Sequence, residues 1–213
     1  MTLLLLVGMI IVSKKLSQLV TSENVQAQKE VVVIDAGHGG HDPGKVGVND
    51  ALEKDVNLQI AEKVKKYLEK NDIDVVMTRE DDVMEDTKLE DMKKRVALTN
   101  KTKPAITVSI HQNSYSDSSV KGAQVFYYTG SEISKNAASL MQAELKKVDT
   151  SNTRQIKSNS DFYMLKKTEV PTIIVECGFL SNPEEAEKLV AEEYQEQMAE
   201  AICRGVLTWV SQN

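Results

Sequence analysis

The 213 residues are enough for one domain, or for one domain with an appended segment. Hydrophobic residues make up 41% and charged residues 27% of the chain, which excludes disordered, collagenous and multi-span membrane proteins. The net charge of −6 argues against nucleic acid as a partner, because duplex binders carry a basic footprint. Two cysteines exclude a disulfide framework, and any histidine-based metal site must draw on His38, His41 and His111.

The amino terminus differs from the rest of the chain. Residues 3–12 form an apolar run that is too short for a membrane span of roughly 20 residues and suits the apolar region of an export signal. Lys14 and Lys15 follow this run and no basic residue precedes it, which is the reverse of the usual charge order of an export signal. Three alternatives therefore stay open: an uncleaved anchor, a translation start a few codons upstream of Met1, and a buried core helix. We interpret residues 1–29 as an export signal or membrane anchor plus linker, and residues 30–213 as the working domain, outside the cytoplasmic membrane.

Apolar patterning predicts alternating strands and helices over residues 30–213. Runs typical of strands lie at 31–34, 73–78, 105–110, 122–128 and 172–175. Amphipathic stripes and capping signals predict helices over 51–70, 87–102, 131–147 and from 183 to the carboxyl end. The polar segment 149–160 between them carries no predicted element. This alternation predicts a single three-layer α/β domain, with a mostly parallel sheet of about six strands and helices on both faces.

Polar residues stand where three of the predicted strands end, namely His38, His111 and Glu176. Ligands of open α/β sheets bind beyond the carboxyl ends of the strands, and Glu53 opens the helix that follows the His38 loop. Two imidazoles and one carboxylate suit Zn²⁺, and a catalytic zinc site leaves its fourth position to water. We therefore predict a metal site formed by His38, Glu53 and His111, with Glu176 as general base and acid.

Each of these residues also has a purely structural alternative. Glu53 could complete a capping box that begins at Asp50. His38 could satisfy backbone groups of its glycine-rich loop, or that loop could cradle a phosphate, although it lacks the lysine and spacing of a P-loop. His111 could be a hydrogen-bonded core histidine, and Glu176 could belong to a buried ion pair. The coincidence of all four at one edge of the sheet favours the metal site.

The remaining candidates carry weaker signals. His41 is expected to face solvent or to support the metal ligands from outside. Arg79 and Arg95 are two of only four arginines, and an arginine fork suits carboxylate recognition, with surface ion pairing as the alternative. Cys177 should point to the opposite sheet face from Glu176, because side chains alternate along a strand, and both it and Cys203 should be buried, unreactive thiols.

Six segments carry a family resemblance, and they occur in the family's order along residues 30–212. They are Val33–Gly44, Glu53–Leu58, Thr78 with Arg79, Arg95 with Asn100, Ser109–Asn113, and Val175–Asn182. Together they closely resemble the motifs of the type 3 N-acetylmuramoyl-L-alanine amidases. The resemblance implies that His38, Glu53 and His111 bind Zn²⁺ and that Glu176 is the catalytic glutamate. Substrate contacts are expected from Arg79, Arg95 and Asn113.

The resemblance implies hydrolysis of the amide bond between the lactyl group of N-acetylmuramic acid and L-alanine of peptidoglycan. The chain looks most like the short members that act on spore cortex, where removal of the stem peptide precedes formation of the muramic-δ-lactam needed for germination. This implies a site of action in the cortex or intermembrane space of the forming spore, with an activating protein as a candidate partner. Another zinc hydrolase, such as a peptidase or deacetylase, and a non-catalytic or partner-dependent wall-binding protein are the alternatives.

Overall fold

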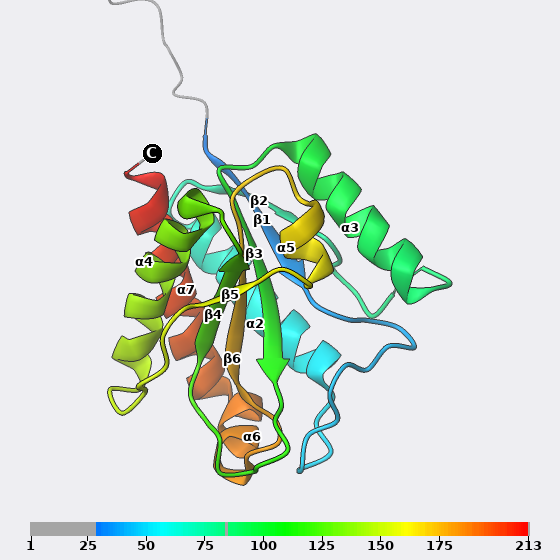
Figure 1. Cartoon of the computed structure of the whole chain (residues 1–213), viewed down its shortest axis with the longest axis vertical. Coiled ribbons are helices and arrows are strands. Elements are labelled where there is room, and N and C mark those ends of the chain that lie inside the picture. The colour runs from blue at the N-terminus through cyan, green and yellow to red at the C-terminus, as the bar shows by residue number, and fades with distance from the viewer. Residues whose placement is uncertain (1–28, 84, 213) are drawn as a thin grey trace, which may run out of the picture.

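The computed structural model describes residues 29–83 and 85–212, which form a central sheet of six strands (Figure 1). The strands are β1 (Val31–Ala36), β2 (Asp74–Met77), β3 (Ile106–Asn113), β4 (Gln124–Tyr128), β5 (Lys157–Asn159) and β6 (Thr172–Phe179). Their order is β2-β1-β3-β6-β4-β5, and every neighbouring pair is parallel except β4 and β6. The predicted mostly parallel sheet is confirmed.

Helices cover the two faces of the sheet unequally. Three long helices cover one face: α2 (Glu53–Glu69), α4 (Glu132–Val148) and α7 (Glu192–Val210). The other face carries α3 (Lys88–Thr102) and the short α5 (Tyr163–Lys167), while α6 (Pro183–Val190) follows β6. Figure 1 shows that α3 and α5 leave the carboxyl-terminal parts of β3 and β6 without a helix in front of them. The three-layer architecture therefore has one partly open face.

The local sequence explains where these helices lie. The α2 stripe of Val56, Ile60, Val64 and Leu68 is fully or almost fully buried in the main core, as a period of about four residues requires. The main core lies between the sheet and α2, α4 and α7. Thr87 caps α3 by accepting a hydrogen bond from the backbone N–H of Glu90, which is the predicted capping box.

Several elements differ from the sequence-based expectation. β3 and β6 run three and four residues further than the predicted 110 and 175, because the ladder between them continues through the polar residues, where His111 pairs with Glu176. The structure adds β5 and α5, whose sequences are too short to carry a periodic signal. In α6, Asn182 caps the helix by accepting a hydrogen bond from the backbone N–H of Glu185, and Pro183 is the first helical residue.

The predicted export signal or anchor, residues 1–29, lies outside the described residues except for its last position. In the part of the chain that the structure describes, every helix is too short or too polar to cross a bilayer.

Candidate metal centre and active site

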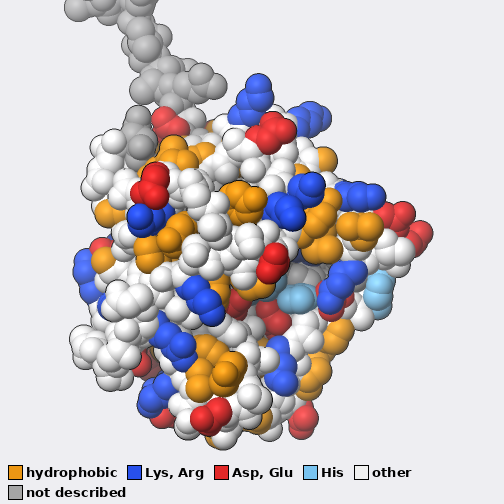
Figure 2. Space-filling model, in the orientation of Figure 1, with side chains coloured by type: hydrophobic (Ala, Val, Ile, Leu, Met, Phe, Trp, Pro, Cys, Tyr) orange, Lys and Arg blue, Asp and Glu red, His pale blue; other side chains and the backbone are white. Residues whose placement is uncertain are grey.

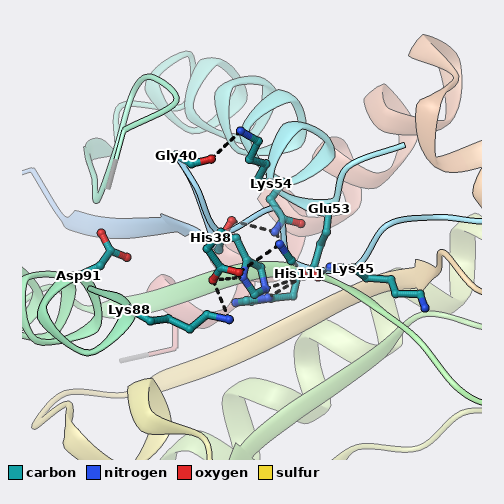
Figure 3. A network of polar contacts seen from close by, with 12 residues as sticks. His38, Gly40, Lys45, Glu53, Lys54, Lys88, Asp91 and His111 are labelled. Atoms are coloured by element: carbon teal, nitrogen blue, oxygen red, sulfur yellow. Dashed lines mark hydrogen bonds and ion pairs between the residues drawn. The ribbon is translucent and has the colours of Figure 1, made fainter. Parts of the chain in front are cut away.

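The structure brings His38, Glu53 and His111 together beside the open face of the sheet (Figure 3). One ligand atom from each of these side chains lies within 4.8 Å of the other two. His38 Nε2 is 3.2 Å and His111 Nδ1 is 2.9 Å from the same oxygen, Glu53 Oε1. Three residues from separate parts of the chain thus place their donor atoms around one small volume.

Two special backbone positions make this convergence possible. His38 has a φ of 63°, a left-handed conformation that non-glycine residues adopt rarely and that turns the chain sharply after β1. Gly37 packs against the ring of His111 so closely that a side chain at this position would overlap the imidazole. The glycine-rich motif after β1 therefore allows His111 to approach the backbone of the His38 loop.

Glu53 is the first residue of α2, and backbone N–H groups of the preceding loop and of β3 hold its carboxylate. Its Oε2 accepts a hydrogen bond from the backbone N–H of Lys45 at 2.7 Å, and its Oε1 accepts one from the backbone N–H of Gln112 at 3.2 Å. Burial raises the pKa of Glu53, but His111 and His38 outweigh burial and hold this pKa well below its usual range. Leu52, with no capping side chain, precedes the helix, so a capping box from Asp50 does not form.

Asp42 contacts the candidate ligand His38, and the sequence did not single it out. Its Oδ2 lies 2.8 Å from Nδ1 of His38, which leaves Nε2 of His38 directed at Glu53. Lys88 contributes a further ion pair to Asp42 at 2.9 Å. Histidines that bind a metal usually pair their second ring nitrogen with a carboxylate, which fixes the tautomer and the ring orientation. A carboxylate four residues after a candidate ligand, in the same loop, was the signal that could have revealed it.

Glu176 lies beside the candidate metal centre on the neighbouring strand β6, because it is the register partner of His111. Its side chain is buried, its Oε2 has no hydrogen-bond partner, and no basic group of residues 29–83 and 85–212 lies in ion-pair contact with it. Burial raises the pKa of Glu176 to about 7, with a further contribution from Glu53 and opposition from His111 and His38. A carboxyl group with this pKa is suited to accept and return a proton near neutral pH.

The residues present fit a divalent metal of the zinc type. Two imidazoles and one carboxylate are the donor set of catalytic zinc sites, in which the fourth position stays open. Burial lowers the pKa of His111, but Glu53 outweighs burial and raises this pKa to about 9. Without a metal, a protonated His111 therefore supplies the positive charge next to Glu53. Metal binding requires the loss of that proton. His38, His111 and Glu176 all line one cavity, and Oε2 of Glu176 is buried without a hydrogen-bond partner.

Arg79, a candidate for substrate binding, is buried and bonded to backbone carbonyls. It donates to the carbonyl oxygens of Ala36, Gly37, Lys54 and Asp81 at distances between 2.7 and 3.2 Å. These bonds connect the end of β1 to the first turn of α2. Its guanidinium is therefore occupied in holding the two segments that carry His38 and Glu53.

Arg95 is likewise buried, and its contacts run to the His38 loop. It pairs with Asp35 at 3.0 Å and with Asp91 at 2.6 Å, and it donates to the carbonyl oxygens of Ala36 and His38 at 2.6 Å each. The carbonyl of His38 belongs to the residue with the left-handed backbone. Arg95 thus ties α3 to the loop that presents His38, a candidate metal ligand.

Replacing Asp35 by Asn should lower the free energy of unfolding by about 3 kcal/mol at pH 7, because it leaves Arg95 buried without its full counter-charge. Burial raises the pKa of Asp35, but Arg95, Ser109 and Thr78 outweigh burial and the pKa is lowered. The stabilisation is therefore present above the unfolded pKa of about 3.9 and is lost as pH falls through the lower folded value. Urea unfolding of the wild type and the variant should give a difference in the free energy of unfolding that becomes smaller below pH 4. A difference at pH 3 equal to that at pH 7 would contradict the stabilising role of the Asp35 carboxylate.

The other predicted residues lie as follows. His41 is exposed in the loop after His38. Cys177 is buried in the main core, on the opposite face from Glu176, and Cys203 is buried in α7, as expected. Burial raises the thiol pKa of Cys177 to about 12 and that of Cys203 to about 11, so both are protonated at neutral pH. Asn113 lies on the open face beyond His111, at the end of β3.

The comparisons with known proteins agree on one family. Residues 32–208 match the model of the N-acetylmuramoyl-L-alanine amidases. The germination-specific N-acetylmuramoyl-L-alanine amidase of Bacillus subtilis (strain 168) is 36% identical over 192 residues, which are 86% of this chain and 81% of that relative.

Solved structures give the same result. The CwlD amidase from Clostridioides difficile, solved in complex with the GerS lipoprotein, matches with a TM-score of 0.83 and 36% identity over 87% of this chain and 100% of that one. The catalytic domain of CwlV from Bacillus (Paenibacillus) polymyxa var. colistinus matches with a TM-score of 0.78 and 32% identity, over 86% and 99% of the two chains. This chain belongs to the N-acetylmuramoyl-L-alanine amidase family.

Proposed function

We propose that this protein is a zinc-dependent peptidoglycan amidase that hydrolyses the bond between the lactyl group of N-acetylmuramic acid and L-alanine. The observation that carries the proposal is the buried, unpartnered carboxylate of Glu176 beside the donor atoms of His38, Glu53 and His111. A protein that only binds cell wall has no use for a proton acceptor at this position. Membership of the amidase family supports the choice of bond.

In this proposal Zn²⁺ is held by His38, Glu53 and His111, and it supplies Lewis acidity that polarises the lactyl carbonyl and makes water easier to deprotonate. Glu176 Oε2 takes the proton of the attacking water and later donates it to the nitrogen of L-alanine as the amide breaks. Asp42 holds Nδ1 of His38, so that Nε2 keeps its direction through the reaction. The open face of the sheet leaves room for a bulky muramyl peptide.

Product analysis separates this activity from those of other zinc hydrolases. The zinc-loaded protein is incubated with a muramyl tripeptide, and the products are identified by mass spectrometry. The expected products are free N-acetylmuramic acid and a tripeptide with an L-alanine amino terminus. Release of acetate would indicate a deacetylase, and cleavage within the tripeptide would indicate a peptidase, so either result would overturn the assignment of the bond.

We propose further that the enzyme acts outside the cytoplasm on spore cortex, with residues 1–29 as export signal or membrane anchor. The germination-specific relative supports the cortex, and the relative solved with a lipoprotein supports a protein partner. Expression of the chain in B. subtilis spores that lack their germination-specific amidase is the test. Restored muramic-δ-lactam and germination are expected, whereas an active enzyme that fails to restore them would place its action elsewhere in the wall.

A further inference from the structure

We infer that a basic groove next to the metal centre binds a carboxylate of the peptide stem, two to three residues from the bond to be cleaved. The inference rests on the proposed function and adds a specificity site to it. The groove is lined chiefly by Asn113, Tyr115, Gln124, Arg154, Lys157 and Phe179. None of these residues except Asn113 was singled out from the sequence as a candidate for substrate binding.

The groove lies on the same open face as Glu176 and continues from it. Gln124 is the register partner of Glu176 on β4, and Asn113 is the register partner of Phe179 on β6. The irregularity in the β3–β6 ladder between His111 and Asn113 lets Phe179 line the groove. Figure 2 shows this face with a histidine and acidic side chains within a hollow and with lysine and arginine side chains around it.

Two cations in the groove have no acidic partner among the described residues. Arg154 donates its Nε to the carbonyl oxygen of Lys121, and its guanidinium carbon lies 4.9 Å from the ring centre of Phe179. Neither terminal nitrogen of Arg154 makes a hydrogen bond to a residue in 29–83 or 85–212. The guanidinium is therefore held in place through Nε, and both terminal NH₂ groups are available to a ligand. Lys157 lies on β5 with its ammonium 5.9 Å from the ring centre of Phe126.

The chemistry of the substrate identifies what these cations recognise. Once the lactyl carboxyl is in amide linkage, the glycan of a muramyl peptide carries no charge, so its negative groups are the carboxylates of the stem. An arginine fork on an aromatic ring matches a planar carboxylate in two parallel hydrogen bonds. Because the protein has a net charge of −6, a local pair of cations also directs an anionic peptide toward this groove.

The dimensions of the strand fix which carboxylate can be reached. Phe179 follows Glu176 by three positions on β6, which corresponds to about 10 Å at a rise of roughly 3.3 Å per residue. An extended peptide covers about the same distance in three residues. The cations beside Phe179 are therefore in reach of the free α-carboxylate of a γ-linked glutamate at the second stem position, or of a carboxylate on the third residue.

Binding to an inactive enzyme tests the groove without turnover. Calorimetry on the zinc-loaded Glu176→Gln variant would compare muramyl tripeptides that differ only in amidation of the second residue, the third residue or both. We expect the free acid to bind about tenfold to hundredfold more tightly than the fully amidated peptide. Arg154→Met and Lys157→Met in the same background should reduce this preference, and Lys101→Met, an exposed lysine at the end of α3, should leave it unchanged.

Equal affinity for the free-acid and the amidated peptide would overturn the inference. So would an undiminished preference for the free acid in both the Arg154→Met and the Lys157→Met variant. Arg154→Lys serves as a second variant that keeps the charge without the fork, and part of the preference should return with it. Thermal unfolding of each variant confirms that it is folded. If the wild type cleaves no muramyl peptide while the Glu176→Gln variant still prefers the acid, the proposed function fails and the groove assignment stands.

Discussion

The Glu176→Gln variant should retain stoichiometric zinc and lose about 10²–10⁴-fold in kcat, the usual contribution of general acid–base catalysis. Glutamine fills the same space but cannot take a proton from water. Glu176 is not among the three residues whose donor atoms converge, so its replacement leaves the proposed metal ligands in place. The loss should therefore fall on kcat, with metal content unchanged.

Steady-state kinetics on a defined muramyl tripeptide, with metal analysis of the same sample, checks this prediction. Glu144→Gln on α4 is the matched control, because α4 covers the opposite face of the sheet from Glu176. This variant also replaces a carboxylate by an amide and should keep the wild-type kcat. Turnover of the Glu176→Gln variant close to the wild-type rate would remove Glu176 from the mechanism.

The His111→Ala variant should lose both zinc and activity. Removal of an outer partner of a metal ligand already costs tenfold to hundredfold in metal affinity, and removal of a ligand costs more. His111 and His38 both contact Oε1 of Glu53. Removal of the His111 imidazole therefore takes away the nearer of these two contacts, at 2.9 Å. A two-ligand site is then expected to release the metal during dialysis.

His41→Ala is the matched control for this prediction. His41 lies three positions after His38 in the same loop but is exposed and outside the donor cluster, so this variant should keep both zinc and activity. Elemental analysis after dialysis distinguishes the two variants. Stoichiometric zinc in dialysed His111→Ala would take His111 out of the ligand set.

The sequence was sufficient for the parts of the fold that repeat a pattern. The buried stripe of α2, the capping box at Thr87 and the β-branched strands follow from periodicity and local hydrogen bonding. β5 and α5 did not follow, because three and five polar or mixed residues have no period and are placed by pairing with β4 and packing against α3. Short elements of this kind depend on tertiary contacts.

The candidate site shows the same division. Strand ends placed His38, His111 and Glu176 at one edge, because parallel neighbours bring their carboxyl ends together. The roles of the arginines were not readable from residue type, since an arginine fork can bind backbone carbonyls and carboxylates of the protein as well as a substrate carboxylate. Arg79 and Arg95 are buried beneath the His38 loop, whereas Arg154, from a segment with no predicted element, has free donors beside the site.

Measuring the formation of new L-alanine amino termini in purified peptidoglycan is the most direct test of the central proposal. The purified protein is incubated with intact peptidoglycan, with added Zn²⁺ in one sample and with a chelator in the other, and the termini are quantified. We expect release with zinc and none with the chelator. Absence of release by folded protein with full zinc occupancy would contradict the proposal, as would release that the chelator does not reduce.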